Sequence, residues 1–255
     1  MTLLSVRSGC VWQLGYPTAS RNDGERALKN AREIGQALTL MYALFRASWM
    51  HMFYGHYAEA QSLLDELAAL AGEKDASLFW KATEISFRGA LFALTGKASD
   101  AVRAITSGMT SLRSTAATLY EPWHLSHLAM AYADLGEHDD ARRCIEDAID
   151  KVERAKEKWC EAEVNRVAGE VALRSSAPDT EKAEEYFDRA LAVARQQQTK
   201  SWELRAAMSM ARLWRDQGKP QQARELLAPV YGWFTEGFDT LDLKEAKTLV
   251  DELTE

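Results

Sequence analysis

Residues 125–148, LSHLAMAYADLGEHDDARRCIEDA, contain two short helical patterns separated by one glycine. In each half, apolar residues recur every three or four positions, as they do on one face of a helix. These residues are Leu125, Leu128, Ala129 and Tyr132 in the first half, and Ala141, Ile145 and Ala148 in the second. Gly136 can take the left-handed backbone conformation that a tight turn needs. The stretch therefore predicts a helical hairpin, in which small alanine side chains let the two helices approach closely.

The same hairpin pattern repeats along the chain. The alanine that corresponds to Ala141 recurs every 40 to 42 residues, and a glycine precedes it in all but one repeat. The alanines are Ala19, Ala60, Ala101, Ala141, Ala183 and Ala223, and the glycines are Gly15, Gly55, Gly96, Gly136 and Gly218. Repeats of this length indicate stacked helix pairs that bury their apolar faces against their neighbours. We therefore expect one all-α domain over residues 1–255, a right-handed superhelix of about six hairpins with a charged capping helix over residues 241–253.

Composition narrows the classes of function. The 255 residues are 47% hydrophobic and 27% charged, with a net charge of −7 and no basic face, so we do not expect a nucleic-acid partner. The cysteines, Cys10, Cys144 and Cys160, are odd in number and lack metal-binding spacing, which is typical of reduced thiols in a cytoplasmic protein. The sequence shows neither a signal-peptide pattern nor an apolar run that could span a membrane. No polar capping helix precedes the first hairpin, so we expect either a fragment or a first helix without a partner.

Residues 38–54 predict a helix with an additional apolar stripe. The stripe consists of Tyr42, Phe45, Trp49 and Met52. A helix that is apolar nearly all round is buried nearly all round. The stripe has three candidate covers: the chain's own residues 1–14, a second copy of the chain or an upstream domain, and an aromatic ligand. A second copy would make these four residues a homodimerisation surface.

The order of small, aromatic and aliphatic residues in the hairpins resembles the tetratricopeptide repeat, in a variant whose unit is longer than the basic 34 residues. Four segments resemble, more specifically, the C-terminal repeat region of bacterial signalling proteins that join an adenylate or guanylate cyclase domain to an AAA-like ATPase domain. They are LGYP (residues 14–17), YAL (42–44), KSWELRAAMSMARLWRDQGK (200–219) and ARELLAPVYGWFTEGFDTLDLKEAKTLVDEL (223–253). The resemblance implies a sensory or scaffold module. The chain has no G-x-x-x-x-G-K-[ST] motif, so no catalytic residue of that family can be transferred to it, and we do not expect an enzyme.

In a tetratricopeptide superhelix, the first helix of each pair lines the concave side. This resemblance implies a groove that binds a protein or peptide. The residues expected to line it are Trp123, Ser126, Met130, Asn165, Arg205, Met208 and Arg212. Arg205 and Arg212, with Arg215 nearby, would suit an acidic peptide, because a guanidinium group binds a carboxylate with paired donors. The alternative is that they form ion pairs with Glu203 or Asp216.

Other chemistry has weaker support in the sequence. His124 and His127 lie one helical turn apart and could share a metal ion, but no third ligand is evident, so we expect neither a metal nor another cofactor. Adjacent carboxylates such as Glu161 and Glu163 are typical of a solvated helix face. A small-molecule or enzymatic site in the groove is the alternative to protein binding. A scaffold predicts a wide, shallow groove, whereas an enzyme predicts an enclosed pocket with converging polar groups.

Overall fold

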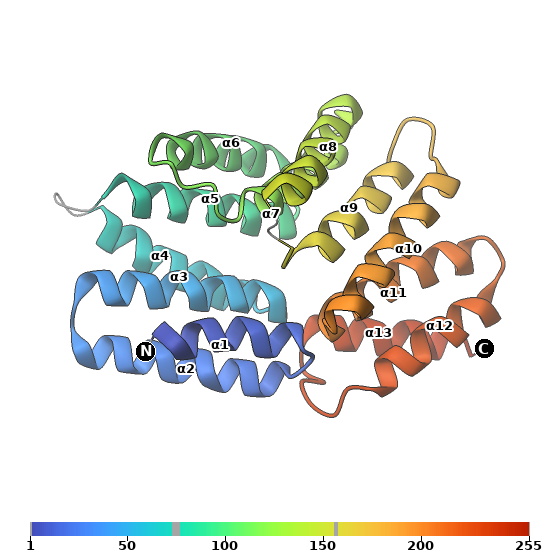
Figure 1. Cartoon of the computed structure of the whole chain (residues 1–255), viewed down its shortest axis with the longest axis horizontal. Helices are drawn as coiled ribbons and strands as arrows, with labels where there is room; N and C mark the ends of the chain where they lie inside the picture. Colours follow the sequence, from blue (N-terminus) through green and yellow to red (C-terminus); the bar gives the residue numbers. More distant parts are fainter. Residues whose placement is uncertain (1, 73–76, 156–157, 255) are drawn as a thin grey trace.

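The computed structural model describes residues 2–72, 77–155 and 158–254. Over these residues the chain forms thirteen α-helices and no β-strand (Figure 1). The helices are α1 (Thr2–Gln13), α2 (Pro17–Ile34), α3 (Ala37–Tyr54), α4 (Tyr57–Ala71), α5 (Leu78–Leu94), α6 (Ala98–Ser114), α7 (Glu121–Asp134), α8 (His138–Ala155), α9 (Glu161–Leu173), α10 (Thr180–Gln197), α11 (Lys200–Asp216), α12 (Pro220–Gly232) and α13 (Leu241–Glu252). None of the described helices combines the length and apolar character needed to cross a bilayer.

Successive helices pack as hairpins, which confirms the predicted all-α repeat solenoid. The first twelve described helices form six pairs, from α1–α2 to α11–α12, and α13 packs on the last pair. The repeating alanines Ala60, Ala101, Ala141, Ala183 and Ala223 are all fully buried. The expectation of a first helix without a partner is wrong, because Ser8 Oγ of α1 donates to Ser20 O of α2 at 2.8 Å and Ser20 Oγ donates to Ser8 O at 2.6 Å.

Small residues set how closely paired helices approach. Gly89 of α5 lies so near α6 that a Cβ atom there would be 2.6 Å from Ile105 Cγ1 and 2.7 Å from Ile105 N. Gly108 of α6 likewise faces the backbone of Ser86. At these two positions glycine permits a close contact between helices, and any larger residue would push the two helices apart.

The last helices return to the first, a closure that the sequence analysis did not predict. In Figure 1, the blue α1–α2 hairpin lies beside the red α12–α13 segment. Ser201 Oγ of α11 donates to Trp12 O of α1 at 2.5 Å. Leu241, at the start of α13, packs directly on Gly55 at the end of α3. The solenoid therefore closes on itself instead of leaving a free concave side.

The loop between α12 and α13, residues 233–240, completes this closure. Glu236 Oε1 accepts a hydrogen bond at 2.9 Å from the backbone N–H of Ala19, in the first turn of α2. Arg21 Nη1 donates to Asp239 Oδ2 at 2.7 Å, and Pro17 packs against Gly237. Since no side chain next to α2 in sequence caps its first turn, the distant Glu236 carboxylate takes that role.

Candidate functional site

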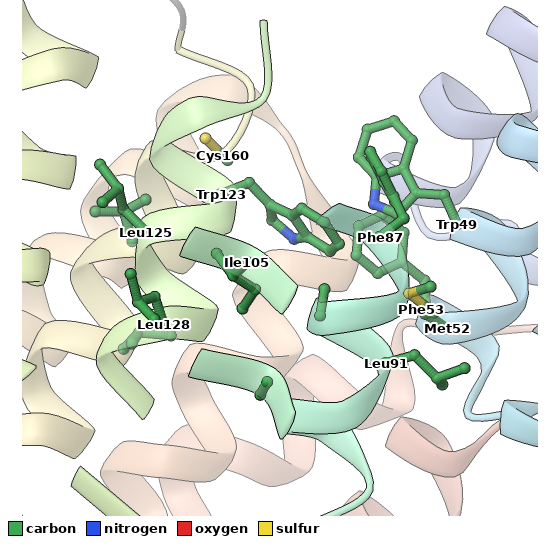
Figure 2. Packing of buried hydrophobic residues seen from close by; sticks show 14 of the residues in the cluster. Trp49, Met52, Phe53, Phe87, Leu91, Ile105, Trp123, Leu125, Leu128 and Cys160 are labelled. Carbon is green, nitrogen blue, oxygen red and sulfur yellow. The ribbon is translucent and has the colours of Figure 1, made fainter. Parts of the chain in front are cut away.

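The interior of the solenoid is filled by aromatic side chains that lie on, or directly before, the first helix of each pair. We call this cluster the aromatic centre. It consists of Trp12, Phe45, Trp49, Phe53, Phe87, Tyr120, Trp123, Trp159 and Trp202. Figure 2 shows Trp49 and Phe53 of α3 facing Phe87 of α5 and Trp123 of α7. The ring centroids of Phe87 and Trp123 lie 5.1 Å apart, and those of Trp49 and Trp159 also lie 5.1 Å apart.

The aromatic centre covers the second apolar stripe of α3. Within residues 1–14, Trp12 stacks on Phe53, but the larger cover comes from α5, from α7 with Tyr120 before it, and from Trp159 before α9. Of the four expected self-association residues, Phe45, Trp49 and Met52 are buried and Tyr42 is half-buried. A second copy cannot reach the three buried side chains in this structure. The structure therefore gives no support to a homodimer through this stripe, and the homodimer stays a prediction.

Several polar atoms in and beside the aromatic centre are buried without a hydrogen-bond partner among the described residues. They include the indole nitrogens of Trp49, Trp123 and Trp159 and both ring nitrogens of His124. An unsatisfied buried donor costs about 1–3 kcal/mol. Apolar burial and ring packing, rather than hydrogen bonds, therefore hold this part of the molecule together.

Arg205 connects the aromatic centre to α13. Its guanidinium carbon lies 5.2 to 5.5 Å from the ring centroids of Trp12, Phe53 and Trp202, within cation–π range. Its Nε donates to Asp242 Oδ2 at 2.7 Å, and its Nη1 lies 3.5 Å from Glu163 Oε1. Burial raises the pKa of the Asp242 carboxyl above its ordinary value, although Arg205 opposes this effect. Arg205 is therefore a structural contact between both ends of the solenoid and is not free to bind a partner's carboxylate.

All three arginines expected at the C-terminal end of the groove are paired with α13. Arg215 also pairs with Asp216, as one alternative proposed, whereas Glu203 pairs with Arg195 and Lys200. The partners on α13 are Asp242 for Arg205 at 2.7 Å, Glu245 for Arg212 at 2.7 Å and Glu252 for Arg215 at 2.8 Å. The acidic face of the chain's own last helix thus occupies the place where we expected an acidic peptide.

An open pocket of about 240 Å³ lies between α5, α7 and α9, and we call it the polar pocket. Its lining residues are Ala93, Leu94, Ser126, His127, Met130, Asp134, Glu163, Arg166, Val167 and Arg174. Two of the predicted groove residues, Ser126 and Met130, are among them. The other predicted residues lie elsewhere: Trp123, Asn165 and Met208 are buried in helix packing, and Arg205 and Arg212 pair with α13.

One side of the polar pocket is an ion pair on α9. Arg166 Nε and Nη2 donate to the two oxygens of Glu163 at 2.8 and 2.9 Å. Arg166 Nη1 also reaches Glu170 and Ser209, each at 3.3 Å. Burial alone would raise the pKa of Glu163, but Arg166 and Arg205 outweigh it and lower that pKa to about 2. Glu163 is therefore ionised at neutral pH, and its two oxygens are largely occupied.

His127 provides the pocket with a neutral acceptor. Its Nδ1 lies 2.9 Å from Trp123 O, and because a carbonyl oxygen only accepts, Nδ1 holds the hydrogen. Burial lowers the pKa of His127 to about 4, with Arg205 and Arg166 adding to the effect. The imidazole is thus neutral at pH 7 with its lone pair on Nε2. No hydrogen bond joins Nε2 to a described residue, and His127 is one of the residues that line the pocket.

The structure brings no third metal ligand to His124 and His127 among the described residues. Burial, with a smaller contribution from His127, lowers the pKa of His124 to about 3, and its ring packs edge-on against Phe87 with centroids 4.8 Å apart. Within the described parts of the chain, no three His, Cys, Asp or Glu side chains are grouped so as to hold a metal ion.

Sequence reasoning missed all four charged residues that line the pocket, Asp134, Glu163, Arg166 and Arg174. Two of them, Glu163 and Arg166, lie with Glu170 at three- and four-residue spacing along the first helix α9, although Glu170 does not line the pocket. That charged stripe, on a helix expected to be buried, was the signal that could have revealed these residues. Charged residues are rarely buried without a partner, so the stripe indicates ion pairs inside the groove. Asn165, chosen instead, is almost fully buried, and its Nδ2 donates to Glu161 O within the same helix.

Comparison with known proteins agrees with the repeat architecture. The tetratricopeptide-repeat family model matches residues 122–147 and 204–229, and the model for anaphase-promoting complex subunit 5 matches residues 18–83. No curated protein matches the chain. The crystal structure of BtubC (BKLC) from P. vanneervenii is similar in fold, with a TM-score of 0.55 at 15% identity over 92% of this chain and 88% of that one. None of these matches names a cyclase or an ATPase, so that resemblance is not confirmed.

Proposed function

We propose that the chain is a protein-interaction module whose polar pocket anchors a segment of a partner protein. Tetratricopeptide repeats, which two segments match, generally mediate protein–protein contacts. The observation that favours the polar pocket is its composition, since three adjacent first helices bring a neutral acceptor, two ion pairs and apolar side chains to one opening. The aromatic centre and the arginines facing α13 are already occupied by the chain itself.

The alternative is a small-molecule or enzymatic site in the same pocket, because its polar groups converge as that alternative predicts. Its volume of about 240 Å³ lies below the range of roughly 300–1,000 Å³ that is usual for ligand sites. Ser126 Oγ donates to Trp123 O at 2.7 Å and so is not activated by a base. We therefore propose a binding site for one protruding partner group and not a catalytic centre.

We propose further that the chain serves as the sensory or scaffold part of a cytoplasmic bacterial signalling protein. The sequence resemblance of residues 200–219 and 223–253 supports this context. Sequencing the DNA around the natural gene tests it. An adjoining or fused cyclase or ATPase reading frame is the expected result, and a gene encoding neither would contradict the proposal.

Site-specific photocrosslinking tests the proposed binding site. We would place p-benzoylphenylalanine at Leu94, an exposed residue at the pocket, and at the control position Glu225, an exposed residue of α12 that does not line the pocket. In cells of the natural host, we expect a discrete crosslinked protein from position 94 and none from position 225. Equal labelling from both positions, or none from either, would contradict binding at the pocket.

A further inference from the structure

We infer that the polar pocket accepts one tyrosine side chain of the partner, with the phenol hydroxyl donating to His127 Nε2. This inference rests on the proposed function and names the group that the pocket recognises. It follows from three properties of the lining residues: the spare hydrogen-bonding capacity, the charge balance and the apolar walls.

The spare hydrogen-bonding capacity of His127 is that of an acceptor. His127 Nδ1 is committed to Trp123 O, so Nε2 offers a lone pair and no hydrogen. Ser126 is fully buried, and its hydroxyl hydrogen is committed to the same carbonyl oxygen at 2.7 Å, so it offers no donor to a ligand. A ligand group that reaches this point must therefore bring a donor.

The charges around the pocket disfavour an ionic ligand. Glu163 pairs with Arg166 at 2.8 Å, and Asp134 pairs with Arg174 at 2.8 Å, so the lining residues have no net formal charge. A carboxylate would approach two carboxylates, and an ammonium group would approach two guanidinium groups. A neutral donor meets neither repulsion and leaves both ion pairs intact.

The walls of the pocket suit an aromatic ring. Ala93, Leu94, Met130 and Val167 supply apolar surface, and a methionine thioether makes favourable contacts with aromatic rings. Phenylalanine would fill the same space but leave His127 Nε2 unpaired. Tryptophan has a donor but no acceptor, whereas the phenol oxygen can also accept from Arg166 or Arg174, which line the same pocket.

Nuclear magnetic resonance of the full chain with ¹⁵N-labelled histidine tests the inference. The probes are N-acetyl-L-tyrosinamide and N-acetyl-L-phenylalaninamide. We expect the tyrosine probe to shift the His127 Nε2 resonance and to bind about five- to tenfold more tightly than the phenylalanine probe, the ratio that one net hydrogen bond supplies. His56 lies outside the pocket, so its resonances serve as the internal control.

The variant His127→Phe separates recognition from packing. If it folds, it should bind the two probes equally, because the acceptor is gone while the apolar walls remain. In the unmodified chain, equal affinity for both probes, absence of binding, or a shift at His56 without one at His127 would each overturn the inference. Crosslinking from position 94 would then still support partner binding at the pocket, so failure of the tyrosine inference is distinguishable from failure of the proposed function.

Discussion

The guanidinium carbon of Arg205 lies 5.3 Å from the centre of the Trp12 indole ring, which places a cation of α11 against an aromatic face of α1. Phe53 O also accepts a hydrogen bond from Arg205 Nη2 at 3.3 Å. The same side chain pairs with Asp242 on α13. One arginine of the last hairpin therefore contacts the first two hairpins and the capping helix. This relationship leads to the first prediction.

Replacing Arg205 with alanine should destabilise the chain strongly. The Asp242 and Glu163 carboxylates would lose a buried cationic neighbour, a loss that typically costs roughly 3–5 kcal/mol. The matched control is Arg212→Ala, whose pair with Glu245 is about 40% exposed and should cost at most about 1 kcal/mol. Urea denaturation monitored by tryptophan fluorescence measures both variants. Equal midpoints for the two variants would show that Arg205 does not hold the closure.

Gly237→Ala should weaken the contact between the α12–α13 loop and α2. Gly237 has φ +78°, and a Cβ there would lie 2.6 Å from Pro17 Cγ. The control is Gly218→Ala, at φ +76° with no atom within 4 Å of the added Cβ. Both variants incur about 1 kcal/mol of backbone strain, and Gly237→Ala should lose a further ~1–3 kcal/mol from the clash. Thermal unfolding compares them, and equal losses would argue against a tight closure.

Two helical glycines should respond to alanine with opposite signs. Gly24→Ala adds a Cβ 3.4 Å from Ser8 Oγ and improves helix propensity, so it should stabilise the chain by up to about 1 kcal/mol. Gly89→Ala places its Cβ 2.7 Å from Ile105 N and should destabilise by about 1–3 kcal/mol despite the same gain in propensity. Chemical denaturation gives both values. A stabilising Gly89→Ala would mean that α5 and α6 are farther apart than described.

Acidification below pH ~6.5 should destabilise the folded chain through its buried histidines. Burial lowers the pKa of His124 to about 3 and that of His127 to about 4, whereas an unfolded histidine titrates near pH ~6.5. The unfolded state therefore binds more protons between those values, and stability falls as the pH drops below ~6.5. The loss should reach roughly 3 kcal/mol per histidine at pH ~4.

The variant His124→Phe tests this assignment. Since neither ring nitrogen of His124 has a partner among the described residues, the replacement should be neutral or stabilising at pH 7. It should also reduce the loss of stability between pH 7 and pH 4.5, leaving the contributions of His127 and His51. Urea unfolding across this range measures the slope. An unchanged slope would show that His124 does not stay neutral in the folded state.

The repeat unit was predictable because the information for it is local. Helix periodicity, a turn glycine and a small residue recur within about forty positions, and each hairpin buries its face against the next. The capping helix was predictable for the same reason. The pairing of its acidic residues Asp242 and Glu245 with arginines of α11 was not predicted.

The closure and the polar pocket were not predictable in this way. The hydrogen bond between Ser201 and Trp12 depends on small rotations between successive hairpins, which accumulate over the whole solenoid. No local sequence pattern specifies the total rotation. The groove prediction assumed an open concave side, and it identified Ser126 and Met130 but also the buried Trp123. His127 was considered only as a possible metal ligand, and only its hydrogen bond to Trp123 O reveals which ring nitrogen holds the hydrogen.

The hydrogen bonds of Glu236 and Asp239 to α2 also affect the cooperativity of unfolding. A linear array of repeats can fray from its terminal units while the middle stays folded, as in a one-dimensional zipper. Here the α1–α2 hairpin contacts α11 and the loop before α13. Unfolding at either end of the solenoid therefore breaks contacts that stabilise the other end. Amide hydrogens of α2 and α13 should consequently exchange together, at a rate set by a shared opening event rather than by two independent ones.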